Sequence, residues 1–209
     1  MNIRVSPIGL LSGLLVSIII TAQVREQKSP PPHSCPGGFV SPILETIVPT
    51  SLEQMILGAD LIVVGTVVNT LPAFQRNPPR TDAIETDSVI SVTERLAGTL
   101  PPGINRIVLF QIGGTVGNCT EIVQDDPLVK LGEEFVLFLW PDDRKQVPNT
   151  SGLPRYGAFG VWSGKVKVVN GSIHFLPRAT KGLHDYDNIG ASAFIARVKD
   201  RINTIPPAK

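Results

Sequence analysis

Residues that commonly build metal and redox sites are scarce in this chain. Its 209 residues include two cysteines, three histidines and two tryptophans. Cys35 and Cys119 lie far apart, whereas zinc sites need clustered ligands, so we expect no bound metal and no cofactor.

An excess of one charge is also missing. Lysine and arginine number 19 and aspartate and glutamate 18, which gives a formal charge of +1 at pH 7. A chain without a basic excess exerts no general attraction on nucleic acid or on an anionic membrane surface, and we expect neither as a partner. Apolar residues make up 42% and charged residues 18%, a balance that allows one packed domain.

Long apolar runs are absent except near the start of the chain. Arg4 precedes an apolar stretch over residues 8–20, and small residues follow up to Ala22. This order is typical of a secretory signal peptide, which we assign to residues 1–22. The stretch is shorter than the about 20 residues of a membrane-spanning helix, and an uncleaved anchor over residues 5–22 is the alternative. We expect an exported protein, extracellular or at the cell surface, with no other membrane contact.

Export would determine the oxidation state of the two cysteines. In an oxidising compartment Cys35 and Cys119 are expected to form one disulfide, which stabilises by roughly 4–5 kcal/mol in the chain-entropy model. The alternative is two thiols in a reducing compartment. Residues 23–50 are rich in proline and are expected to form an irregular tether without regular elements, ordered near Cys35 if the disulfide forms.

Beyond residue 50 the apolar pattern predicts a series of strands. Short β-branched or alternating runs predict strands over residues 61–68, 86–96, 106–112 and 134–140. The Asn-Gly dipeptide at 170–171 predicts a two-residue hairpin between strands over 165–169 and 172–175. The turn sets the register and places Val168 opposite Ile173.

Two helices flank these strands. Ser51 can cap a short helix, Gln54 completes a capping box, and Gly58 is well placed to end it. A second helix is expected over 191–203, where Phe194 and Val198 recur at helical spacing. The predicted loops are rich in glycine or proline and cover residues 71–81, 98–103, 113–126 and 141–157.

These elements indicate a mainly β protein. Short strands with long loops and terminal helices are typical of a small antiparallel barrel or sandwich. Strands do not alternate with long helices, so a parallel α/β sheet is not expected. We assign the β domain to residues 51–178, and a loop with a C-terminal helix packed on it to residues 179–209.

Four stretches carry a resemblance to known proteins: ADLIVVGTVV (59–68), VTERLAGTLPPG (92–103), PLVKLGEEFVLFL (127–139) and GAFGVWSGKV (157–166). The pattern is similar to that of uncharacterised exported bacterial proteins built on an OB-like barrel, which loosely resemble the netrin/tissue-inhibitor (NTR-like) module. The resemblance covers residues 51–169 and implies a small antiparallel OB-like barrel. NTR-like modules often tie an N-terminal cysteine to a barrel loop, which fits Cys35 and Cys119. Protease inhibition is an alternative function that this resemblance implies.

One polar cluster suits acid–base or metal chemistry. His184 is followed by Asp185 and Asp187, and it is the only histidine beside carboxylates in the sequence. The alternative is a polar loop before the final helix. We assign no catalytic residue, but an exported hydrolase or metal-dependent enzyme using His184 is the alternative function.

Aromatic side chains are candidates for a ligand surface. Tyr156, Phe159 and Trp162, together with Trp140, can line a groove on one face of a barrel, or they can be core residues. A well-formed scaffold without a convincing catalytic cluster favours binding over catalysis. The sequence therefore predicts an exported, non-enzymatic interaction module that contacts a protein or glycan partner.

Overall fold

The computed structural model of the chain describes residues 37–41 (backbone only), 48–75, 83–124, 126–144, 151–177 and 179–205. The chain divides into two units, Met1–His33 and Ser34–Lys209, and all described residues belong to the second. The expected leader and Cys35 lie outside the described residues. Within the described part, no helix combines the length and the apolar character needed to cross a membrane.

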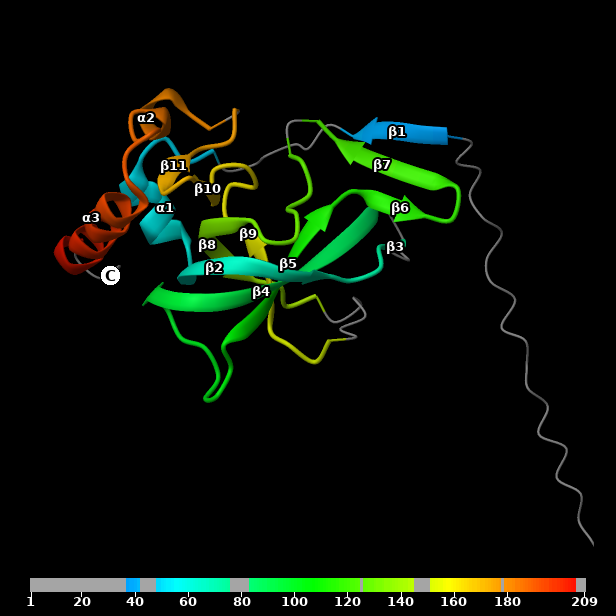
Figure 1. The fold of residues 1–209 in the computed structure, drawn as a ribbon, viewed down its shortest axis with the longest axis horizontal. Coiled ribbons are helices and arrows are strands. Elements are labelled where there is room, and N and C mark those ends of the chain that lie inside the picture. The colour runs from blue at the N-terminus through cyan, green and yellow to red at the C-terminus, as the bar shows by residue number, and fades with distance from the viewer. Residues whose placement is uncertain are drawn as a thin grey trace, which may run out of the picture. The chain divides into compact units, whose positions relative to one another are not determined.

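Five strands close a barrel (Figure 1): β2 (Leu61–Thr70), β4 (Ile84–Ala97), β5 (Arg106–Ile112), β8 (Glu134–Pro141) and β9 (Arg155–Ala158). Their order is β8-β2-β4-β5-β9, and β9 pairs with β8 to complete the ring. This is the five-stranded arrangement of an OB-like barrel, so the mainly β, OB-like fold expected from the sequence is confirmed. One seam differs from an antiparallel sheet, because β5 and β9 run parallel.

The strand β2 is apolar on both faces for a structural reason. Leu61 and Val63 belong to a hydrophobic cluster that takes side chains from all five barrel strands. Ile62 and Val64 belong to a second cluster, which includes buried residues of the helices. Side chains alternate across a strand, so a strand that lies between two apolar layers appears in the sequence as an unbroken apolar run.

A hairpin extends the sheet beyond the barrel. Strand β10 (Lys165–Val169) pairs with β8, and β11 (Ser172–His174) pairs with β10. The register places Val168 opposite Ile173, as predicted. Asn170 and Gly171 both have positive φ, at 50° and 77°, which is the backbone conformation that a type I′ turn requires.

A small second sheet forms where loops were expected. It consists of β1 (Gly37–Ser41), β7 (Cys119–Val123) and β6 (Gly114–Val116), in the order β1-β7-β6. The predicted loop over 113–126 is therefore wrong. The hairpin is short and polar, and a cross-strand hydroxyl contact of 3.0 Å between Thr115 and Thr120 supports it. The expectation of no regular element in the proline-rich tether is also wrong, because β1 occupies the proline-free residues between Pro36 and Pro42.

Three further short elements were also predicted as loop. These are β3 (Phe74–Gln75), which pairs with β4, the closing barrel strand β9, and α2 (Lys181–His184). Each has four residues or fewer. Such elements are too short for a periodic apolar pattern, so tertiary contacts decide where they form.

The other two helices agree with the sequence. Helix α1 (Leu52–Gly58) and α3 (Ala191–Thr204) lie with α2 on the same side of the barrel as β10 and β11 (Figure 1). The Ser51 hydroxyl accepts a hydrogen bond from the Gln54 amide at 3.3 Å, as a capping residue should. The Gln54 side chain accepts from the Thr50 amide at 2.7 Å, one residue before the position that a capping box predicts. Helix α3 is anchored by Phe194 and Val198, which are fully buried.

We expect the replacement Phe194→Ala to lower the free energy of unfolding by about 3–5 kcal/mol, because it leaves a cavity between α3 and the sheet. The matched variant Leu57→Ala truncates a side chain on α1 that is 58% exposed. It should change the free energy of unfolding by less than about 0.5 kcal/mol. Urea denaturation followed by far-UV circular dichroism measures both. Equal losses in the two variants would show that α3 is not docked on the barrel.

Candidate functional site

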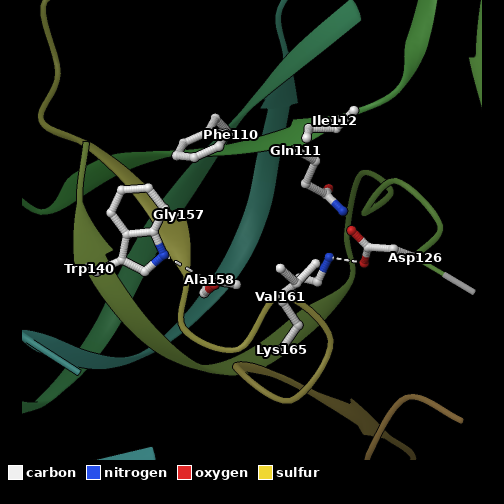
Figure 2. A pocket seen from close by; sticks show the side chains of 9 residues that line it. All are labelled: Phe110, Gln111, Ile112, Asp126, Trp140, Gly157, Ala158, Val161 and Lys165. Carbon is white, nitrogen blue, oxygen red and sulfur yellow. Dashed lines mark hydrogen bonds and ion pairs between the residues drawn. The ribbon is translucent and has the colours of Figure 1, made fainter. Parts of the chain in front are cut away.

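A pocket lies at the one parallel seam of the barrel. The pairing of β5 with β9 consists of Val108 with Arg155 and Leu109 with Tyr156. Just beyond these pairs lies a cavity of about 90 Å³, which we call the seam pocket (Figure 2). Its apolar lining consists of Phe110, Ile112, Trp140, Gly157, Ala158 and Val161, and its polar lining of Gln111, Asp126 and Lys165.

Two aromatic rings form one side of the seam pocket. Phe110 and Trp140 pack edge to face, with ring centroids 5.5 Å apart, and the Trp140 indole donates to the Ala158 carbonyl at 3.3 Å. Gly157 allows both rings to lie this close to β9. A Cβ at Gly157 would be 2.7 Å from Trp140 Cζ2 and 2.8 Å from Phe110 Cε1. Any other residue at Gly157 would therefore displace the rings.

Polar groups form the opposite side of the seam pocket (Figure 2). The Lys165 ammonium forms an ion pair with Asp126, and both residues are at least 97% buried. Burial lowers the pKa of Lys165, and the charge of Asp126 and its hydrogen bond offset part of this effect. The Gln111 side chain donates to the Pro127 carbonyl at 3.1 Å and accepts from the Val129 amide at 2.8 Å. These contacts hold the segment after β7 against the barrel.

A second cavity adjoins Lys165 and has a different lining. Its volume is about 130 Å³. We call it the lysine cavity, because Lys130, Lys165 and Lys167 line it together with Glu133 and apolar side chains. Lys167 donates to Glu133 at 2.6 Å, and the other Glu133 oxygen accepts from the Lys130 amide at 2.9 Å. Burial alone would raise the pKa of Glu133, but the contacts with Lys167 and Lys130 outweigh it and lower that pKa.

A buried ion network contacts the Phe110 ring. Glu85 and Asp87 of β4 and Asp142 after β8 surround the Arg155 guanidinium, which donates to Asp87 at 2.7 Å and to Glu85 at 2.8 Å and also contacts Asp142. Arg144 bonds Asp142 and Glu85. Both guanidinium groups stack on the Phe110 ring, at 4.4 and 4.5 Å from its centroid.

The aromatic residues singled out in the sequence occupy different places. Tyr156 belongs to the barrel cluster, and Phe159 packs against the helix-side cluster. Trp162 is 96% buried. None of these three lines either of the two cavities, whereas Trp140 does line the seam pocket.

Sequence reasoning missed the polar side of the seam pocket. Lys165 begins a strand that alternates lysine with valine, and this pattern predicts an exposed lysine rather than a buried one. Asp126 and Gln111 had no local signal, since their roles depend on contacts between segments far apart in the chain.

The structure brings His184 and Asp187 together. His184 Nδ1 lies 2.6 Å from Asp187 Oδ2, and Asp187 Oδ1 accepts from the Phe175 amide at 2.7 Å. Asp185 is the C-cap of α2. This cluster ties the end of α2 to the segment after β11, and neither the seam pocket nor the lysine cavity includes it. Among the described residues, no group of three or more histidine, cysteine, aspartate or glutamate side chains is placed to hold a metal ion.

We expect Arg155→Met to destabilise the fold by about 3–5 kcal/mol, because it removes the guanidinium that neutralises the buried Asp87 carboxylate. Arg106→Met is the matched control, since Arg106 is exposed at the start of β5, and it should change stability by less than about 0.5 kcal/mol. Thermal and urea unfolding of both variants provide the measurement. A loss no larger than that of the control would mean that the ion network does not hold β9 in place.

A comparison of the sequence with protein-family models and with curated proteins found no match. The chemistry of the site is therefore inferred from its own residues.

Proposed function

We propose that this protein is an exported, non-enzymatic interaction module that binds a protein partner. The seam pocket carries this proposal. In the partner, one apolar side chain enters the pocket, and the surrounding surface of the barrel contacts the rest of the partner. Interfaces commonly concentrate their binding energy in such anchors, where a side chain fills a desolvated pocket.

The volume of the seam pocket favours an anchor over a whole ligand. Pockets for small molecules usually measure about 300–1,000 Å³. The seam pocket, at about 90 Å³, is smaller than the cavity of about 150 Å³ that holds a benzene molecule. A sugar ring is larger than benzene, so a side chain of a protein fits this volume better than a glycan residue.

The lining of the seam pocket favours an apolar occupant. Six of its nine residues contribute apolar surface, including the Phe110 and Trp140 rings. On this side of Lys165 its charge is neutralised by Asp126, and the Gln111 side chain bonds two backbone groups. An aliphatic side chain gains contact with the rings and breaks none of these bonds.

The outer surface near the pocket argues against a nucleic-acid ligand. OB folds bind oligonucleotides and oligosaccharides on the face of their second and third strands, between two loops. The corresponding strands here are β4 and β5. The start of β4 carries Glu85 and Asp87, whose carboxylates are buried in ion pairs with arginine. This part of the face is therefore filled by side chains of the protein itself.

The proposal includes export and a disulfide between Cys35 and Cys119. The register of β1 on β7 pairs Gly37 with Cys119, and Cys35 is two residues before Gly37, so the disulfide requires the chain to turn toward β7 before β1 begins. A bridge at this point would fix the start of β1 to the second sheet. Its closed loop is long, which favours a large entropic stabilisation.

We expect the secreted protein to lack about the first 22 residues and to be lighter by two hydrogen atoms before reduction than after it. Intact-mass measurement with and without a reducing agent tests both points together. An unchanged mass on reduction would exclude the disulfide, and a full-length protein recovered from the membrane fraction would support the anchor instead.

We expect peptides selected on the protein from a displayed random library to share an aliphatic residue and to lose at least about tenfold in affinity for the variant Gly157→Ala. The added methyl group displaces the Phe110 and Trp140 rings and so reshapes the seam pocket. The matched control is Gly190→Ala, because a Cβ there meets no atom within 4 Å and the backbone φ is −59°.

Equal affinity of the selected peptides for both glycine variants would contradict the proposal. A glycan partner would be favoured instead if the protein bound glycans on an array, lost this binding in Gly157→Ala, and yielded no peptide whose binding depends on Gly157. The methyl group added in Gly157→Ala overpacks the site and costs about 1–3 kcal/mol of stability. Circular dichroism of this variant therefore checks that the fold is retained.

A further inference from the structure

We propose that the lysine cavity is a binding site for a small oxyanion, such as sulfate, phosphate or a carboxylate group. The site is separate from the seam pocket, so the inference does not depend on the proposed protein partner. It rests on the charge of the cavity lining, on the burial of Lys165 and on the volume of the cavity.

The charge of the lining favours an anion. Lys130, Lys165 and Lys167 line the cavity, and Glu133 is the one acidic residue in its lining. Asp126, the partner of Lys165, lines the seam pocket and does not line the lysine cavity. Lys165 lines both cavities, whereas its counter-ion belongs to the lining of the seam pocket alone. An oxyanion there meets three positive side chains and one negative one.

Lys165 has hydrogen-bonding capacity to spare. Its ammonium group carries three donors, and among the described residues it donates to Asp126 alone. The residue is 98% buried, so its charge acts in a medium of low dielectric constant, where an anion is attracted more strongly than in water. Burial lowers the pKa of Lys165 by disfavouring its charged form, and an anion beside the ammonium would favour the charged form.

The other side chains complete the site at its rim. Lys130 is exposed and is brought to the cavity by the turn that precedes β8, where the Glu133 amide donates to the Lys130 carbonyl at 3.0 Å. Lys167 is 35% exposed at its side chain. Glu133 would repel an anion, but its two oxygens are engaged by Lys167 and by the Lys130 amide, which leaves the lining positive overall.

The volume limits the size of the ligand. The cavity, at about 130 Å³, is well below the about 300–1,000 Å³ of pockets that hold whole small molecules. A tetrahedral oxyanion or a carboxylate group fits this volume, and a nucleotide does not. The competing interpretation is that the cavity holds only water beside two structural ion pairs.

The test is a titration of the purified secreted protein with sodium sulfate at constant ionic strength, followed by amide NMR. We expect saturable shifts confined to residues 128–135, 165–167 and Leu176, which line the cavity or lie between the residues that do. Lys130→Gln should weaken binding about tenfold, because it removes a charge and a donor without breaking any side-chain bond among the described residues. Lys181→Gln, at an exposed lysine on α2, is the matched control and should bind as the wild type does.

Parallel titrations with phosphate and acetate identify the source of the anion. Stronger binding of sulfate or phosphate indicates a free or substituted tetrahedral oxyanion, and stronger binding of acetate indicates a carboxylate carried by a larger ligand. Shifts that do not saturate, or equal affinity of Lys130→Gln and the wild type, would overturn the proposal and leave a cavity that holds water. Loss of peptide binding by Gly157→Ala is independent of this result, so the two proposals fail separately.

Discussion

The structure depends on how a four-residue strand, β9, closes the barrel. Each of its residues has a separate role. Arg155 holds the strand to β4 through buried ion pairs, and Tyr156 fills the barrel interior. Gly157 makes room for two aromatic rings, and the Ala158 carbonyl accepts from the Trp140 indole. Because β9 pairs with β5 at two positions only, the seam ends early, and the seam pocket lies where it ends.

Buried charges hold the loops at this end of the barrel. Arg144 and Arg155 bind carboxylates from β4 and from the segment after β8, and Lys165 binds Asp126. Ion pairs of this kind gain little stability over apolar packing, because both charges lose their hydration. They specify geometry, since each charge accepts only a few arrangements of its partner. A sequence with balanced charge can therefore bury its charges and still leave a positive cavity beside them.

The sequence predicted the parts of the fold that have local signals. The strands β2, β4, β5 and β8 were predicted from apolar runs, and the β10–β11 hairpin from its Asn-Gly turn, because these patterns reflect burial on one or both faces. The elements β6, β7 and β9 had no such pattern. Strand β9 forms because the longer strands β5 and β8 provide edges to pair with, whereas β6 and β7 pair with each other and with β1. Trp140 could be proposed from the sequence, because aromatic residues are candidates for a ligand surface wherever they occur. Asp126 and Gln111 could not, because their roles depend on contacts with distant segments.

The amino-acid sequence by itself determined a mainly β barrel with terminal helices, since apolar periodicity and turn residues act over a few neighbouring positions. It also determined the chemistry available, with few cysteines and histidines and no excess of charge. Only the tertiary structure decided which of these groups meet. Lys165 and Asp126 are distant in the chain and come together because β10 extends the barrel sheet and the segment after β7 folds over its end. Contacts between distant segments leave no local pattern in the sequence, so neither cavity could be predicted before the arrangement of the barrel strands was known.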